Sequence, residues 1–549
     1  MPEITGLGLP GPEAVVRCHV GLEEGMVMPG MKISAVLGLL LGLTSAPVVM
    51  ADVLEDIGID ALMERLGPQA MPTGLGVRIA QVEADESGNY APDEANSHFT
   101  GKTFHIQSGV TGASGHATSV CQWMCGNDWS PAPGVTDIDC WSLSDWCLDG
   151  FLRANFSSSF PPWGTPNFIK NFNLSWIASY GNVNNNHQVL RRADYVVERD
   201  NVMMCHAVGN AGQASIPLMT CMFNGLSVGK RSGSHLTEDT VAGIEGAGRM
   251  RPEIVAPLST SSAATGLVSG VMTLLVETAQ ADDSLDSQAE DTEVIKALLL
   301  AGATHVQFEG LWANGAVTDG AQRGTSIRPL NNTLGAGMVN ADRSHRMLTA
   351  GRTWGGLSSS SPAAADLHGW DQAFCLSSSS RWWSFSLDGR VENATIVATW
   401  NRIVNDDYTG YAMGNADLEL WRVNADGQLA SLVGDAGLTF FEGGNVTSQS
   451  AVDNVELLSV DGLAPGDYVL ELRHASSGVN SITAGMAWYF SDPEVVDVPG
   501  DLDGDGQVGV NDLLLVIAQW NCTEDCTADA DGDGVVDVSD LLIVIANWD

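Results

Sequence analysis

The chain has 549 residues, which is too long for one ordinary domain and predicts about three. Its hydrophobic share of 44% and charged share of 17% are typical of a globular protein with large cores and exclude a mostly disordered chain. The 25 basic and 67 acidic residues give a net charge of −42, which argues against nucleic acid as a partner because phosphate binding needs a basic surface.

An apolar segment near the N-terminus has the features of a secretory signal peptide. Residues 31–51 begin with Lys32, continue with an apolar stretch and end in small residues that approximate an A-x-A cleavage site. The segment is too short to span a bilayer, and we expect no later membrane span. We therefore expect residues 1–30 to be an extension from a start codon placed too early, and the mature chain to begin near Asp52, outside the cell.

Export makes the cysteines informative, because disulfides persist in oxidising compartments. Cys205 with Cys221, and Cys522 with Cys526, are natural local pairs, and Cys375 is left over. A zinc site is not expected, because no matching second ligand pair lies nearby. Two bridges of open pairing are predicted within a cluster of four residues, namely Cys121, Cys125, Cys140 and Cys147.

Between residues 52 and 355, apolar runs alternate with helical patterns, which predicts a mostly parallel sheet covered by helices. A short strand ends in Glu83, and a small-residue turn carrying His116 leads into a helix. A later strand leads into a Gly-Asn-x-Gly turn that carries Asn210. Strand ends of such sheets are where binding and catalytic sites are built.

Ser262 precedes an apolar segment of helical length, residues 266–276. The free N–H groups and the dipole of a helix N-terminus favour developing negative charge, so a hydroxyl placed there can serve as a nucleophile. The alternative is an ordinary N-capping serine in front of a core helix.

Taken together, these motifs resemble those of the subtilisin-like serine peptidases, over about residues 70–350. GVRIAQVE is similar to the strand that ends in the acidic triad member, GHATSV to the catalytic histidine segment, CHAVGNAG to the oxyanion asparagine segment, and RPEIVAPLSTSSAATG to the nucleophile block. The order acid, histidine, serine is also that of subtilisin. The resemblance implies a subtilisin-like α/β domain with Glu83, His116 and Ser262 as the catalytic residues and Asn210 as the oxyanion donor.

The segment also departs from the family at the positions nearest the chemistry. The acidic position holds Glu83 rather than aspartate, with Asp85 as an alternative triad member. Gly266 stands where the family has a proline after the nucleophile, and Thr260 where it has a glycine. These differences keep a catalytically inactive relative, acting as a calcium-dependent surface or scaffold protein, as the alternative to an enzyme.

Residues 356–492 contain short alternating strands separated by turns, which predict a β-sandwich. The region resembles the accessory jelly-roll modules that follow secreted bacterial peptidases, and implies a stabilising or substrate-presenting role. Trp400 and Trp421 could bind carbohydrate, but a large aromatic residue in a sandwich is more often part of the core.

Residues 493–549 contain a repeat in which an acidic loop, DLDGDGQVGVND or DADGDGVVDVSD, precedes an apolar helix. Calcium prefers several oxygen ligands, with glycine at the sixth loop position. The repeat resembles dockerin modules, which implies bound Ca²⁺ and a cohesin or cell-surface partner. The predicted ligands are Asp501, Asp503, Asp505, Gln507 and Asp512 in the first loop, and Asp529, Asp531, Asp533, Val535, Asp537 and Asp540 in the second.

The sequence as a whole predicts a secreted serine endopeptidase that cleaves polypeptides through an acyl-enzyme and is tethered or docked by its C-terminal module. Glu83 is expected to orient His116, the general base for Ser262.

Overall fold

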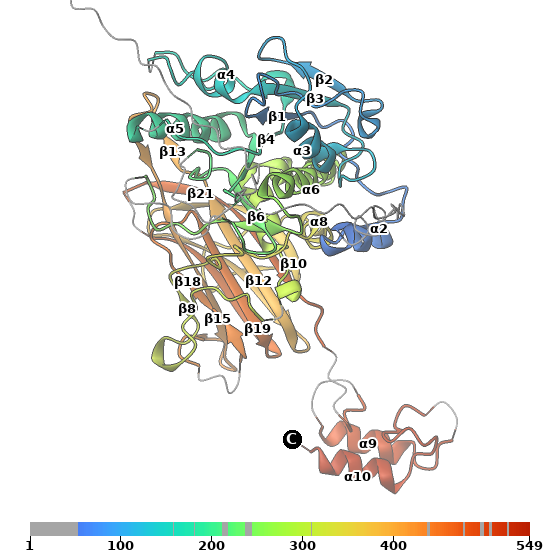
Figure 1. Ribbon diagram of the computed structural model, residues 1–549. Coiled ribbons are helices and arrows are strands. Elements are labelled where there is room, and N and C mark those ends of the chain that lie inside the picture. Colours follow the sequence, from blue (N-terminus) through green and yellow to red (C-terminus); the bar gives the residue numbers. More distant parts are fainter. Residues whose placement is uncertain are drawn as a thin grey trace, which may run out of the picture.

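The computed structural model describes residues 53–157, 159–180, 182–210, 218–235, 244–308, 310–435, 440–475, 478–494, 499–503, 508–523 and 526–548. The predicted signal segment 31–51, Asp505 and Gln507 lie outside the described residues. The described chain forms an α/β part, two packed sheets beside it and a C-terminal helix pair set apart from both (Figure 1).

The α/β part is built on a seven-stranded sheet in the order β2-β3-β1-β4-β5-β6-β7. Every neighbouring pair in it is parallel. Its central strands are buried on both faces, as in other parallel sheets, and they bury polar side chains such as Gln81, Asn171 and Asn173 among their apolar ones. The strands are β1 (Ile79–Glu83), β2 (Thr103–Ile106), β3 (Asp137–Ser142), β4 (Asn171–Leu174), β5 (Met203–Ala207), β6 (Leu226–Lys230) and β7 (Ile254–Ala256).

Helices cover both faces of this sheet, as the alternating pattern predicted. On one face lie α3 (Gly115–Cys125) and α6 (Ser261–Ala281), and the same apolar cluster includes α2 (Ile59–Leu66), α7 (Thr292–Ala301) and α8 (Ala341–Ala350). The other face packs against α4 (Leu143–Leu148) and α5 (Val183–Asp200). Among the described helices, α6 alone has the length and hydropathy of a membrane span, and 78% of its apolar window is buried in the fold, as in a core helix. The predicted α/β class is confirmed.

Two antiparallel-rich sheets enclose a second core, in agreement with the expected β-sandwich. Trp400 is fully buried there and donates its indole N–H to Gly414 O at 3.0 Å, which is the structural role favoured for it. The first sheet contains β10 (His368–Leu376), β21 (Ser481–Phe490), β12 (Val391–Trp400), β19 (Val455–Leu463) and β17 (Gly443–Gly444). The second contains β8 (Thr325–Ser326), β18 (Thr447–Ser448), β15 (Asn415–Val423), β20 (Gly466–Ala475), β11 (Ser380–Leu387), β9 (Ala363–Ala364) and β16 (Leu429–Ser431). A short separate hairpin pairs β13 (Ile403–Val404) with β14 (Tyr411–Ala412).

The α/β part and the sandwich share strands and core. Strand β8 precedes the expected boundary at residue 355, yet it pairs with β18 of the sandwich. Buried sandwich residues such as Trp370 and Leu457 belong to the same apolar cluster as Leu298 of α7. The domain boundary at residue 355 is still a prediction. The two parts on either side of it pack against each other through shared strand pairing and a shared apolar core.

Buried charges also cross this contact. The Arg402 side chain, from the sandwich, donates from Nε to Asp194 Oδ2 of α5 at 2.6 Å, and both residues are fully buried. A second guanidinium nitrogen of Arg402 lies 2.7 Å from Glu245. A buried charge is tolerated only when it is paired in this way, so the contact is specific rather than incidental.

The C-terminal part has its own small core. Helices α9 (Val510–Ala518) and α10 (Val538–Ala546) pack around five buried apolar residues, Val508, Val516, Ala528, Val536 and Val544. The predicted disulfide between Cys522 and Cys526 is present.

The other predicted bridges are wrong, because the remaining described cysteines are buried thiols. Cys205 lies in the core on one face of the sheet and Cys221 in the core on the other face. Cys140 and Cys147 are separated in the same way. Cys121 and Cys125 share one face of α3 with their sulfur atoms 3.5 Å apart, a contact between thiols. Local spacing did not reveal which face of the sheet each cysteine occupies.

Candidate active site and calcium-binding module

Glu83 and His116 form a hydrogen-bonded pair at the carboxyl ends of the strands. Glu83 is the last residue of β1 and is fully buried, and its Oε2 lies 2.7 Å from His116 Nδ1 near the start of α3. The charge of Glu83 raises the pKa of His116 above its usual 6.5. A carboxylate at Nδ1 leaves Nε2 to act as the acceptor of a proton.

Asp85 does not take this place. Its Oδ2 accepts a hydrogen bond from the Ser142 hydroxyl at 3.2 Å, at the end of β3. Of the two acidic candidates, the structure brings Glu83 to the histidine.

Glu86, which the sequence did not single out, holds the start of α3. Its Oε2 accepts from the Ser114 hydroxyl and from the Gly115 N–H, both at 2.9 Å. The hydrogen bond from Ser114 lowers the pKa of Glu86, so this carboxylate stays charged beside the helix N-terminus. The sequence offered only a weak indication of this contact, namely an acidic residue, Glu86, and a Ser114-Gly115 pair typical of a helix start.

Ser262 lies inside the first turn of α6 and is not its cap. The helix begins five residues earlier than predicted, because Thr260 is the N-cap and its side chain accepts from Ala263 N at 3.2 Å. Thr260, a departure from the family, therefore has a local role. The Ser262 hydroxyl donates to Ser175 O at 3.2 Å, and the Ser175 hydroxyl donates back to Ser262 O at 2.9 Å. These bonds tie the start of α6 to the chain leaving β4.

Asn210 is hydrogen-bonded to the N-terminus of the same helix, α6. Its Oδ1 accepts from Ser261 N at 2.7 Å and from the Ser261 hydroxyl at 3.0 Å. Because Oδ1 is occupied by donors, the amide Nδ2 faces away from Ser261, and no described residue accepts from it. Ser261, which the sequence did not mark, thus orients the predicted oxyanion donor.

The register between α3 and α6 bears on how His116 and Ser262 lie relative to each other. A Cβ built on Gly266 would lie 2.7 Å from Val120 O, and one on Gly270 would lie 2.9 Å from Met124 O. Both contacts advance by four residues on each helix, which is about one turn. One turn back, the same register pairs Ser262 with His116. Within the described chain, no hydrogen bond joins the side chains of His116 and Ser262.

This register also explains Gly266, the departure at the family's proline position. The backbone of α3 occupies the space that any Cβ at residue 266 would need. Glycine is therefore required by the close approach of the two helices, although it weakens the helix by about 1 kcal/mol relative to alanine.

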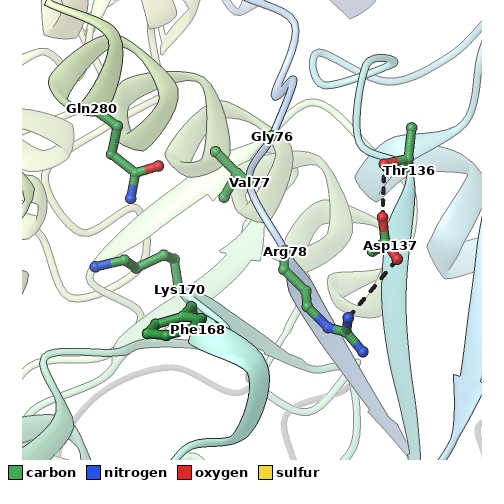
Figure 2. A pocket seen from close by; sticks show the side chains of 8 residues that line it. All are labelled: Gly76, Val77, Arg78, Thr136, Asp137, Phe168, Lys170 and Gln280. Carbon is green, nitrogen blue, oxygen red and sulfur yellow. Dashed lines mark hydrogen bonds and ion pairs between the residues drawn. The ribbon is translucent and has the colours of Figure 1, made fainter.

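A hollow of about 340 Å³ lies at the amino-terminal ends of the strands, beside the residues that lead into β1, β3 and β4 (Figure 2). Lys170 and Gln280 border it, and Arg78 is held by the buried Asp139 at 2.6 Å. It is remote from Glu83 and His116, which lie at the carboxyl ends of the strands, and it is therefore not part of this site.

Each of the two C-terminal loops brings several carboxylates close together. Asp501, Asp503 and Asp512 can bring oxygens within 4.8 Å of one another. The second loop does so with Asp529, Asp531 and Asp533. Such clusters of hard oxygen donors fit Ca²⁺.

The last acidic residue of each loop closes it. Asp540 is buried and accepts from Ala530 N at 2.6 Å and Asp537 N at 2.7 Å. Asp512 makes the equivalent bonds to Leu502 N and Gly509 N, both at 2.7 Å. Asp537 caps α10 by accepting from Ser539 N, and Val535 N donates to Asp533.

Comparison with known proteins bears on the C-terminal part. Residues 499–547 match the model of the Dockerin type I domain. The chain ends in a dockerin domain. Dockerin domains generally bind calcium, and the acidic clusters lie within this one. The comparison with curated proteins found no significant match.

Solved structures similar to this chain are proteases of low identity. A mutant protease domain of PatA is 16% identical, covers 51% of this chain and 98% of its own, and gives a TM-score of 0.35. A cold adapted subtilisin-like serine proteinase is 16% identical over 43% of this chain and 85% of its own, with a TM-score of 0.29. Tripeptidyl Peptidase 2 is 10% identical over 69% of this chain and 40% of its own, with a TM-score of 0.28.

Proposed function

We propose that the chain is a secreted serine endopeptidase, docked through its dockerin domain, that cleaves polypeptides through an acyl-enzyme. The observation that carries this proposal is the 2.7 Å bond between buried Glu83 and His116 Nδ1, on a helix whose register faces Ser262.

The proposed chemistry assigns one task to each residue. Glu83 holds the Nδ1 proton of His116, so that Nε2 can take the proton of the Ser262 hydroxyl as it attacks a peptide carbonyl. The oxyanion that forms receives hydrogen bonds from Asn210 Nδ2 and from the Ser262 N–H at the start of α6. His116 then returns the proton to the leaving amine, and water releases the acyl group by the same steps in reverse.

The Ser262 hydroxyl must rotate for this reaction, because it donates to Ser175 O in the absence of substrate. Catalytic hydrogen bonds are often formed only in the substrate complex. The same bond is the observation that favours the alternative, an inactive relative whose serine serves only to join α6 to β4.

The dockerin domain supports a docking role. Proteins with such domains are typically extracellular or on the cell surface, and dockerins typically bind cohesins. Its two helices expose matching apolar residues at helical spacing, a surface suited to burial against a partner. These residues are Val510, Leu514 and Ile517 on α9 with Trp520 just after it, and Val538, Leu542 and Ile545 on α10 with Trp548 just after it.

A fluorophosphonate probe tests the proposal directly, because it reacts with an activated serine. The wild-type chain should be labelled, Ser262→Ala should not, and the exposed neighbour variant Ser259→Ala should be labelled like wild type. A folded wild-type chain without label would refute the enzyme, and label that survives in Ser262→Ala would refute the site. Cleavage of a casein substrate by the same three proteins provides the activity measurement.

A further inference from the structure

The proposed acid carries one more methylene than the aspartate of the family, and the structure contains a second residue that holds it. Gln81 lies two positions before Glu83 on β1, and both are fully buried. Side chains two apart on a strand point to the same face. Gln81 Nε2 lies 2.8 Å from Glu83 Oε1, while Glu83 Oε2 is bound by His116. Among the described residues, these are the donors to the Glu83 carboxylate.

The same amide is tied to the helix that carries the histidine. Gln81 Nε2 also donates to Ala117 O at 2.9 Å, and Ala117 follows His116 on α3. Both acceptors are oxygens, so the orientation of the amide is unambiguous. One side chain thus fixes the carboxylate and the backbone next to His116 against each other.

The environment of the Gln81 carbonyl oxygen indicates that the contact with Glu83 has a role besides packing. Gln81 Oε1 is buried and has no hydrogen-bond partner among the described residues. A buried polar atom without a partner destabilises a fold, so an apolar side chain would suit this position better if stability alone mattered.

We infer that Gln81 is a positioning residue that holds the carboxylate of Glu83 on His116 Nδ1, which allows a glutamate to serve where the family uses aspartate. The inference rests on the proposed function. Without the amide, the longer side chain can rotate about its additional bond, and the carboxylate leaves the plane of the imidazole.

The test measures the pKa of His116 by NMR on the full chain with labelled histidine, in wild type, Gln81→Met and Glu83→Gln. Glu83→Gln removes the charge and defines the full fall of the pKa. Gln81→Met keeps the length of the side chain without the donor, and we expect the pKa to fall part of the way and kcat/KM to fall by about 10- to 100-fold. The matched control is Asn171→Leu on the neighbouring strand β4, which removes a buried hydrogen bond from the Asn171 amide to Ser269 O of α6 and should leave the pKa of His116 in place.

An unchanged or higher pKa of His116 in Gln81→Met would overturn the inference, because the carboxylate would then need no second donor. The wild-type chain offers a measurement that does not depend on the folding of a variant. The side-chain amide signal of Gln81 should titrate with the same midpoint as His116, and an amide that ignores this titration would also overturn the inference. Neither measurement needs activity, so a chain that fails the fluorophosphonate test can still pass or fail this one.

Discussion

The proposed active site and the calcium loops reach their geometry by different routes. Each predicted calcium loop draws its carboxylates from one acidic stretch of twelve residues, so local sequence nearly determines the proposed site. The active site joins the end of β1, the starts of α3 and α6 and the turn after β5. Local patterns can mark its members, but only the packing of the sheet and helices decides whether they meet.

The two regions also differ in what stabilises them. The proposed active site lies beside a core that runs from the α/β part into the sandwich. The dockerin domain has five buried apolar residues, one disulfide and loops crowded with carboxylates. The first should therefore depend on packing and the second on bound ions, and variants can separate the two.

The largest expected effect is loss of the base. His116→Ala should reduce kcat by about 10⁶-fold, the size seen when the triad histidine is removed from subtilisin. Its melting temperature should also fall, because the fully buried Glu83 carboxylate loses its charged partner. Steady-state kinetics with a peptide substrate provide the measurement, and a variant that retains a tenth of the wild-type rate would break the proposed link between the histidine and Ser262.

Loss of the Glu83 charge should have the next largest effect, about 10⁴-fold in kcat for Glu83→Gln. The charge raises the pKa of His116, so in wild type the neutral base, and with it kcat/KM, appears only above about pH 6.5. In Glu83→Gln this acidic limb should move to lower pH. A pH–rate profile tests both points, and a limb that moves to higher pH would contradict the pairing.

The same shift has a consequence for stability. Because the folded-state pKa of His116 is raised, the pair stabilises the fold fully below about pH 6.5. That contribution is lost as the pH rises through the folded-state pKa. Urea unfolding of wild type and Glu83→Gln across this range should show their difference shrinking with increasing pH.

Widening the contact between α3 and α6 should have a smaller effect. The methyl group of Gly266→Ala would lie 2.7 Å from Val120 O, so one helix must move and carry its active-site residue with it. We expect kcat/KM to fall by about 10²-fold, the cost of a misplacement of about 1 Å. The control is Gly164→Ala, where a Cβ meets nothing within 4 Å. Equal activity in both variants would show that the helix register does not set the site.

The smallest effect on the enzyme should come from calcium. Chelation should unfold the dockerin helices, because the ions contribute about 2.7 kcal/mol per site at 100 times the dissociation constant. The melting transition of the α/β part and the peptidase rate should change little. Calorimetry on Asp531→Ala should show one calcium site in place of two, and a rate that falls with chelation would show that the two regions are coupled.

Local sequence was sufficient where structure is local. Short patterns predicted the paired loops, the bridge between Cys522 and Cys526 and the parallel sheet. They also placed Glu83 at the end of a strand and His116 at the start of a helix. These features depend on residues within a few positions of one another, or on hydrophobic periodicity along one element.

Tertiary structure decided the features that depend on residues far apart in the chain. The thiols of Cys205 and Cys221 lie on opposite faces of the sheet, and Gly266 is set by the backbone of α3. Gln81 carries no motif, and its amide reaches Ala117 O, next to His116, only because α3 packs over β1. A side chain's chemistry is present in the sequence, but its partner is chosen by the packing of elements that the sequence places far apart.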